Sequence, residues 1–119
     1  MITVYGIRNC DTIKKTFVWL HQQGLEYQLH DYRKQGVSEA LVDQLMQQFT
    51  LEQLINRRGT TWRNLDEDSK QGLTESSAKT LMQEHPALIK RPILTDGKVW
   101  LIGFDTQAMA EELVAQAGC

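Results

Sequence analysis

The spacing of apolar residues in the first third of the chain predicts a β-α-β unit. Residues 2–5 form a β-branched and aromatic run that ends at Gly6, which predicts a buried strand. Helical spacing follows over residues 11–23, and Gly24 stands where a helix C-terminal glycine belongs. Residues 26–30 then alternate and predict a second strand, which is parallel to the first because a helix connects them. The apolar face of the helix consists of Ile13, Phe17 and Leu20.

Helical spacing returns in the middle of the chain. Ser38 is a suitable cap for a helix whose apolar face lies within residues 41–49, and residues 51–55 predict one further helical turn. After a polar stretch, Thr74 caps another helix, which stops before Pro86. The inward residues of that helix are Ala78, Leu81 and Met82. Helices therefore fill the region between the first two strands and the last third of the chain.

The last third predicts a β-hairpin and a final helix. Residues 93–95 and 98–102 are apolar runs on either side of Asp96-Gly97, which is a strong hairpin signal. Asp105 or Thr106 then starts a helix. Its inward face is Met109, Leu113 and Ala117, with Gly118 at its end.

This order of elements predicts an α/β fold with a mixed four-stranded sheet. It is the order of a thioredoxin-like fold, enlarged by a helical insertion between the parallel strands and the hairpin. The 119 residues are close to the commonest size of one domain, so a single domain over residues 1–119 is expected. A chain of this length buries enough surface to fold without disulfides or metal.

Composition narrows the partners and the compartment. The formal net charge is −2 and no basic block is present, so nucleic acid is not an expected partner. Residues 1–5 lack a signal-peptide pattern, and no apolar run approaches the roughly 20 residues that span a bilayer. We therefore expect a cytoplasmic protein with no membrane partner. In that reducing compartment, a cysteine near the N-terminus is more often redox-active, catalytic or buried than part of a disulfide framework.

Cys10 is the candidate nucleophile. It lies in the loop between the first strand and the first helix, where free backbone N–H groups and the helix dipole favour an anion. Lys14 lies about one helical turn further on and would add a stabilising cation, whereas Lys15 is expected to point into water. The alternative interpretation of Cys10 is a buried cysteine that acts as a small hydrophobic residue.

The residues after Cys10 modify this prediction. Asp11 and Thr12 can both cap the helix and complete the environment of the thiolate, although the charge of Asp11 partly offsets its stabilisation. Ile13 occupies the position at which a dithiol motif has its second cysteine. Cys119 is the last residue and would resolve a disulfide only if the final helix ended near Cys10. No metal is expected, because His21, His30 and His85 lack metal-ligand spacing.

Three separated blocks of sequence resemble the arsenate reductase-like (ArsC/Spx) family, and its small YffB-type branch most of all. They are residues 6–15, 56–62 and 89–93, so the resemblance spans nearly the whole chain. It implies a thioredoxin-like fold in which Pro92 follows a cis peptide bond and arginines surround the cysteine thiolate. The residues that it assigns to substrate or glutathione binding are Asn9, Arg58, Arg91 and Pro92.

The resemblance gives these residues specific roles. Arg91 is expected to face Cys10 and to hold a carboxylate or an oxyanion through two hydrogen bonds. Arg58 matches the arginine of the middle block better than its neighbour Arg57, although either can face the site, and the alternative for both is a solvated loop charge. The backbone before Pro92 would pair with an extended substrate peptide.

The favoured function is a glutathione-dependent thiol-disulfide reductase. A single site cysteine needs an external thiol to resolve its mixed disulfide, and glutathione is the natural cytoplasmic choice, with a glutaredoxin as a further candidate partner. One alternative is a regulator of the Spx type that binds RNA polymerase without catalysis. Another is a weak arsenate reductase, which is disfavoured because residues 103–105 read Gly-Phe-Asp where arsenate reductases carry a further arginine.

Overall fold

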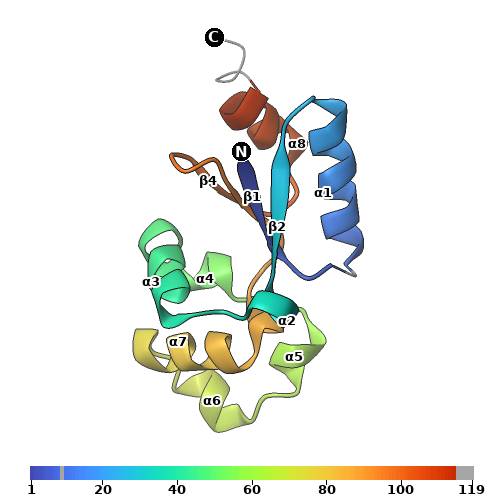
Figure 1. The fold of residues 1–119 in the computed structure, drawn as a ribbon. Coiled ribbons are helices and arrows are strands. Elements are labelled where there is room, and N and C mark those ends of the chain that lie inside the picture. The colour runs from blue at the N-terminus through green and yellow to red at the C-terminus, as the bar shows by residue number, and fades with distance from the viewer. Residues whose placement is uncertain (9, 115–119) are drawn as a thin grey trace. The chain divides into compact units, whose positions relative to one another are not determined.

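The computed structural model describes residues 1–8 and 10–114, and their contacts divide the chain into two units. The first unit combines Met1–Tyr32 with the chain from Arg91 onward, and the second is Arg33–Lys90 (Figure 1). The second unit coincides with the predicted helical insertion. The expectation of one domain over residues 1–119 stays a prediction.

A mixed four-stranded sheet forms the centre of the first unit, as predicted (Figure 1). The strand order is β2-β1-β3-β4, where β1 is Ile2–Gly6, β2 is Tyr27–Asp31, β3 is Ile93–Thr95 and β4 is Trp100–Ile102. The first two strands are parallel, with Ile2 opposite Tyr27. The third strand runs antiparallel to β1 and pairs Thr3 with Thr95, and β4 is antiparallel to β3. The α/β class and the thioredoxin-like arrangement are thereby confirmed.

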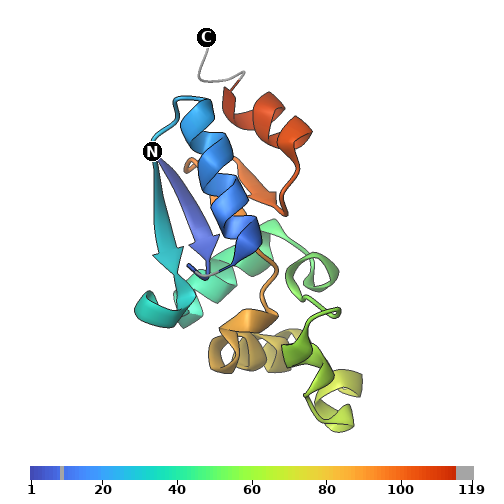
Figure 2. The ribbon, with the colours of Figure 1, turned by 90° about the vertical axis from the view of Figure 1, so that its right-hand side faces the viewer.

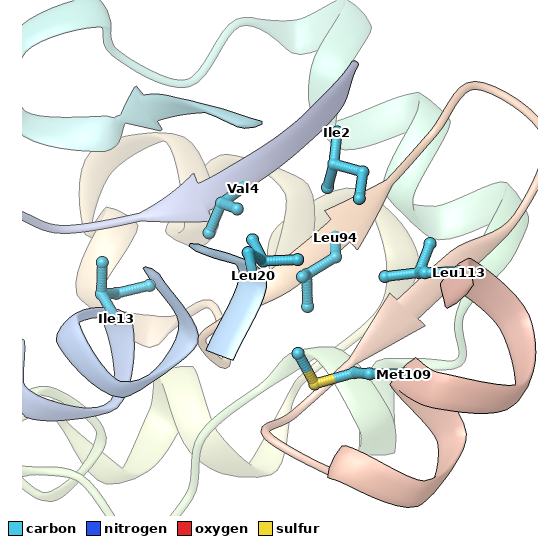
Figure 3. Packing of buried hydrophobic residues seen from close by; sticks show 7 residues of the cluster. All are labelled: Ile2, Val4, Ile13, Leu20, Leu94, Met109 and Leu113. Atoms are coloured by element: carbon cyan, nitrogen blue, oxygen red, sulfur yellow. The ribbon is translucent and has the colours of Figure 1, made fainter. Parts of the chain in front are cut away.

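The core of the first unit lies between one face of this sheet and three helical segments. These are α1 (Asp11–Gln22), α8 (Thr106–Met109) and the π-helical turn η2 (Ala110–Val114). Figure 2 shows α1 lying across the strands. Strand side chains alternate between faces, so every second residue of β1 enters this core. Figure 3 shows the cluster, which consists of Ile2, Val4, Ile13, Leu20, Leu94, Met109 and Leu113.

Gly6 allows α1 to approach the end of β1 closely. A Cβ atom at Gly6 would collide with the side chain of Ile13, which is 0% exposed. Any larger residue at Gly6 would therefore push the first turn of α1 away from the sheet. The glycine that ends the predicted strand therefore also determines how closely α1 packs on the sheet.

The second unit is helical, and its predicted caps are confirmed. Ser38 accepts a hydrogen bond from the N–H of Leu41 and caps α3 (Glu39–Gln48). Thr74 forms a capping box with Ser77 at the start of α7 (Glu75–Glu84). The two helices contact each other, and Lys79 links them through ion pairs to Glu39 and Asp43, each with an N–O distance of 2.7 Å. The predicted turn at 51–55 is α4 (Leu51–Leu54), and α2 (Tyr32–Gln35) follows β2.

Two short helices lie in the polar stretch between the predicted turn at 51–55 and the helix that Thr74 caps. They are α5 (Thr60–Arg63) and α6 (Glu67–Gln71), and a 3-10 turn, η1 (Pro86–Leu88), follows α7. Neither α5 nor α6 has a buried residue, so no apolar period marks them. The carboxylate of Asp66 accepts from the N–H of Ser69, which shows that α6 begins with a side-chain cap. Capping without burial is the reason that apolar spacing misses such helices.

The hairpin and the last helix differ in detail from the prediction. Oδ1 of Asp96 accepts from the N–H groups of Lys98 and Val99, which extends the loop, so β4 begins at Trp100 rather than at Lys98. Gly97 adopts a φ of +100° within that loop. Asp105 is the N-cap of α8 and Thr106 is its first helical residue, so the predicted start of this helix is confirmed. The inward positions of Met109 and Leu113 are confirmed, whereas Ala117 and Gly118 lie outside the described residues.

None of the helices within residues 1–8 and 10–114 combines the length and the apolar character needed to span a bilayer.

The contact between Gly6 and Ile13 gives a stability prediction. Gly6→Ala should lower the free energy of unfolding by about 1–3 kcal/mol, because overpacking forces the buried Ile13 to move. In an Ile13→Val background, which removes the colliding methyl group, the cost of Gly6→Ala should be smaller by about 0.5 kcal/mol or more. Urea unfolding of the four proteins measures this coupling. An equal cost in both backgrounds would show that the collision is not what makes glycine necessary.

Candidate functional site

Cys10 itself is the N-cap residue of α1. Its backbone is extended, with φ −108° and ψ 131°, and Asp11 is already the first helical residue. The prediction that Asp11 or Thr12 caps this helix is therefore wrong, because both lie inside the first turn, where the backbone has left the extended conformation of a cap. The Cys10 side chain is half-buried, packs against the core cluster and makes no side-chain cap hydrogen bond.

The N-cap position places Cys10 next to the hydrogen-bond donors of a helix N-terminus. The first backbone N–H groups of a helix have no partner within it, and an N-cap side chain reaches those of the second and third helical residues. In α1 these residues are Thr12 and Ile13. The N–H of Lys14, by contrast, donates to the carbonyl oxygen of Cys10 at 3.1 Å. A Cys10 thiolate could therefore take the place that a serine or aspartate oxygen usually has at an N-cap.

Lys14 and Lys15 are both exposed on the first turns of α1. Cations near a helix N-terminus oppose the dipole, so the helix itself gains nothing from them. Neither lysine forms an ion pair within the described part of the chain. Both charges are consequently available to an anion next to Cys10.

Arg91 and Pro92 lie beside the end of β1. The peptide bond between them is cis, which confirms the expectation drawn from the resemblance. Cγ of Arg91 lies 3.8 Å from the position of a Cβ at Gly6. The chain continues from Gly6 into the loop that carries Cys10, so the half-buried Arg91 side chain passes the base of that loop. Pro92 is buried, and its carbonyl oxygen accepts from the N–H of Gly103 at 2.8 Å.

Tyr32 carries a buried hydroxyl group with no hydrogen-bond partner among the described residues. The residue is 1% exposed. Burial raises the pKa of Tyr32 well above its usual range, and the nearby Tyr5 adds to this rise, while the positive charge of Arg91 acts in the opposite direction. The phenol therefore stays neutral and gives Arg91 no counter-charge.

The sheet face opposite the core carries an aromatic group that we did not predict. Tyr5 packs against His30 with ring centroids 5.1 Å apart and stacks with Trp100 at 6.0 Å. His30 also meets Tyr32 edge to face. The signal was present in the strands, because Tyr5 and His30 alternate with the core residues of β1 and β2.

Arg58 lies in the second unit, in a pocket of about 390 Å³. The pocket is lined by Glu52, Ile55, Asn56, Arg57, Arg58 and Lys90. The guanidinium of Arg57 lies over the ring of Trp62 at 5.4 Å, whereas the N–H of Arg58 donates to Oδ1 of Asn56. Trp62 therefore engages Arg57, and the ranking of Arg58 above Arg57 as a ligand near Cys10 stays a prediction. Lys90 is a third cation of this pocket that sequence reasoning missed, although it directly precedes Arg91.

Several candidate residues are not placed together by the structure. Asn9 and Cys119 lie outside the described residues. Arg58 and Cys10 belong to different units. Asp105, one of the three residues found where arsenate reductases carry a further arginine, uses its carboxylate to accept from the N–H groups of Gln107 and Ala108. Within residues 1–8 and 10–114, no group of three or more histidine, cysteine, aspartate or glutamate side chains could hold a metal ion.

The sheet, the cysteine at the N-cap and the cis-proline agree with one family. Residues 5–111 match the model of the ArsC family. The chain belongs to the ArsC family. This confirms the resemblance noted in the sequence and gives the protein an arsenate reductase-like, thioredoxin-related fold.

Relatives within this family carry different descriptions. An uncharacterized protein of Haemophilus influenzae is 52% identical over 88% of this chain and 92% of its own length. The solved structure of the YFFB protein has a TM-score of 0.90 and 38% identity over 95% of this chain and 99% of its own. An arsenate reductase (ArsC) related protein from Brucella melitensis has a TM-score of 0.76 and 39% identity, covering 93% and 92%. A global transcriptional regulator Spx of Streptococcus pyogenes is 30% identical over 88% of this chain and 79% of its own.

The unpaired hydroxyl of Tyr32 gives a prediction about pH. Tyr32→Phe should raise the free energy of unfolding at pH 7 by about 1 kcal/mol, because it removes a buried group that has lost its water without gaining a partner. A raised pKa favours the neutral phenol of the folded state. Below pH ~10, the pKa of tyrosine in the unfolded chain, the phenol is neutral in both states and the folded state keeps its full stability. As the pH rises above ~10, the unfolded phenol ionises first, so the free energy of unfolding falls.

Urea unfolding at pH 7 and at about pH 11 measures both effects, and the wild type should lose more stability between them than Tyr32→Phe does. A less stable Phe variant at pH 7 would mean that the hydroxyl has a partner in solution.

Proposed function

We propose that the protein is a glutathione-dependent thiol-disulfide reductase with Cys10 as its nucleophile. The observation that carries the proposal is the position of Cys10 as an uncapped N-cap residue of α1. The N-terminus of α1 and Lys14, which forms no ion pair among the described residues, would stabilise an anion next to Cys10. Cys10 is only partly buried, which argues against a purely structural cysteine.

The proposed reaction has two exchange steps. The Cys10 thiolate attacks the glutathione sulfur of a mixed disulfide, forming a Cys10–glutathione disulfide and breaking the substrate S–S bond. The substrate sulfur leaves as a thiolate and takes up a proton. A second glutathione, as thiolate, then attacks the glutathione sulfur on Cys10 and releases the Cys10 thiolate and oxidised glutathione. The substrate sulfur is reduced to a thiol and the sulfur of the second glutathione is oxidised, while the glutathione sulfur taken from the substrate stays in a disulfide throughout.

An external thiol is needed because the position of a second motif cysteine is filled by Ile13. This side chain is fully buried in the core cluster and supports α1 on the sheet. Glutathione is abundant in a reducing cytoplasm, which is the compartment that we propose. A glutaredoxin is an alternative reductant for the same mixed disulfide.

Cationic side chains supply the proposed contacts to the glutathione carboxylates. Arg91 lies beside the strand that leads to Cys10, and its planar guanidinium can hold a carboxylate through two hydrogen bonds. Arg58 is proposed as a second carboxylate ligand, on the basis of the cationic pocket that it lines with Lys90. The backbone before Pro92 is proposed to pair with the extended substrate. Asn9 remains a candidate from its place beside Cys10 in the sequence.

A non-catalytic regulator is the second candidate, favoured by the identity with an Spx regulator over most of this chain. In that case the surface would bind RNA polymerase, and Cys10 would not turn over disulfides. Arsenate reduction is the less favoured alternative, because Phe104 follows the hairpin where a further arginine would be needed.

The first test is the site of glutathione attachment. Incubation with limiting oxidised glutathione should place one glutathione on Cys10, because the N-terminus of α1 and the lysines on its first turns favour an anionic attacking sulfur there. Peptide mapping by mass spectrometry identifies the modified residue. Cys10→Ser should abolish the adduct and the reductase activity, whereas Cys119→Ser should leave both nearly unchanged. Activity that survives in Cys10→Ser, or preferential modification of Cys119, contradicts the mechanism.

The second test removes the proposed cations one at a time. Lys14→Ala and Arg91→Ala should each lower kcat/KM for glutathione roughly tenfold to a hundredfold, which is the effect of losing one charge-assisted hydrogen bond. Lys98→Ala is the matched control, since Lys98 lies in the hairpin loop at the other end of the strands. Arg57→Ala and Arg58→Ala compare the two neighbours, and only the second should reduce glutathione use. Unchanged kinetics in Lys14→Ala and Arg91→Ala together would place the binding site elsewhere.

Affinity purification from a lysate separates the enzyme from the regulator. Recovery of RNA polymerase subunits by a protein that shows no disulfide reductase activity would overturn the proposed function in favour of the regulator.

A further inference from the structure

An apolar groove lies on the outer side of α1, next to the loop that follows β4. Its volume is about 380 Å³, within the range of about 300–1,000 Å³ typical of ligand pockets. It is lined by Lys14, Lys15, Val18, Trp19, Gln22 and Phe104. Val18 is 57% exposed and Phe104 is 37% exposed. Among the described residues only Met1 is a further large hydrophobic side chain with such exposure, so the exposed apolar surface is concentrated here.

The charge at the rim of the groove is positive. Lys14 and Lys15 lie at its Cys10 end, and no carboxylate belongs to the lining. Neither lysine has an ion-pair partner in the part of the chain that the structure describes. A partner that covers Val18 and Phe104 would therefore gain most if it also brought negative charge to the two lysines.

The groove starts one helical turn from the proposed nucleophile. Val18 is eight residues beyond Cys10 on α1, a distance of about 12 Å at a rise of about 1.5 Å per residue. An extended peptide spans that distance with about four residues at roughly 3.3 Å each. A polypeptide whose sulfur leaves beside Cys10 can thus place a side chain about four positions away into the groove.

We propose that this groove docks the polypeptide substrate through a bulky apolar side chain that is flanked by carboxylates and lies about four residues from the disulfide cysteine. The inference rests on the proposed reductase function and adds a substrate class to it. Val18, Trp19 and Phe104 bind the apolar side chain. Lys15 pairs with a carboxylate, while Lys14 serves both the thiolate and the same acidic segment. Phe104 thereby has a role within residues 103–105, where arsenate reductases carry a further arginine.

A matched pair of synthetic peptides tests the proposal by kinetics. Both carry one cysteine in a mixed disulfide with glutathione. One has a leucine four residues away between two aspartates, and the other has serine and asparagine at those positions. The small substrate is the mixed disulfide of glutathione and 2-mercaptoethanol. The wild type should reduce the leucine peptide with a kcat/KM about tenfold above that of the control peptide, as expected for one buried anchor residue.

Variants locate this preference in the groove. Val18→Ser combined with Phe104→Ser should remove the tenfold preference and leave the rate on the small disulfide unchanged. Lys15→Gln should lower the rate on the acidic peptide by about twofold to fivefold, and added salt should have the same effect on the wild type. His21→Ser, an exposed change on the same helix outside the groove, is the control. Equal rates on both peptides, or an equal loss on the small disulfide, would overturn the docking site.

Binding measured without catalysis separates this inference from the proposed function. In Cys10→Ser, the reduced leucine peptide should shift the NMR signals of the groove residues, including the indole N–H of Trp19, and the control peptide should not. If these shifts occur but the wild type reduces no disulfide, the proposed function fails and the docking surface stands. If the small disulfide is reduced but no groove signal shifts, the docking site is wrong. Shifts that depend on protein concentration alone would assign the groove to a second copy of the chain and overturn the proposal.

Discussion

The close contact between Gly6 and Ile13 determines where the candidate chemistry takes place. Gly6 has no side chain, so the first turn of α1 rests directly on the end of β1. The side chain of Ile13 fills that space and is fully buried in the core. The same contact holds Cys10 at the helix N-terminus, half-exposed and within reach of unpaired N–H groups. A core residue at this position thus supports the turn that follows Cys10 and also occupies the position of a second motif cysteine, so the packing of α1 and the proposed use of an external thiol have one origin.

Positively charged side chains without ion-pair partners among the described residues lie near Cys10. Arg91 passes the end of β1, and the buried hydroxyl group of Tyr32, on which its charge acts, is neutral. Lys14 and Lys15 stand at the positive end of a helix dipole without ion pairs in the described residues. In the second unit, by contrast, Lys79 is satisfied by two carboxylates. The ion-paired Lys79 stabilises the packing of α3 against α7, whereas the two lysines on the first turns of α1 have charge available for an anion.

The sequence predicted those parts of the structure in which burial and local chemistry agree. The β-α-β unit, the caps at Ser38 and Thr74 and the hairpin followed from apolar spacing and turn residues, and the cis bond before Pro92 followed from family resemblance. The helices α5 and α6 were not predicted, because neither has a buried face that would give an apolar spacing. Cys10 was not recognised as the N-cap because cysteine is not a usual cap residue. Lys90 and the aromatic face depend on residues that the fold gathers from separate segments, which spacing along one segment does not reveal.

The sheet of the first unit is assembled from both ends of the chain, which has a consequence for folding. Thr3 pairs with Thr95, so the central strand β1 acquires its second neighbour only after the whole segment Arg33–Lys90 has been made. Pairing over such a separation carries a large loop-closure entropy and slows folding. A segment that first becomes compact through its own local helices shortens the effective loop. We infer that the helical insertion acts as an internal folding module, and that β1 presents an unpaired edge during synthesis until β3 has been made.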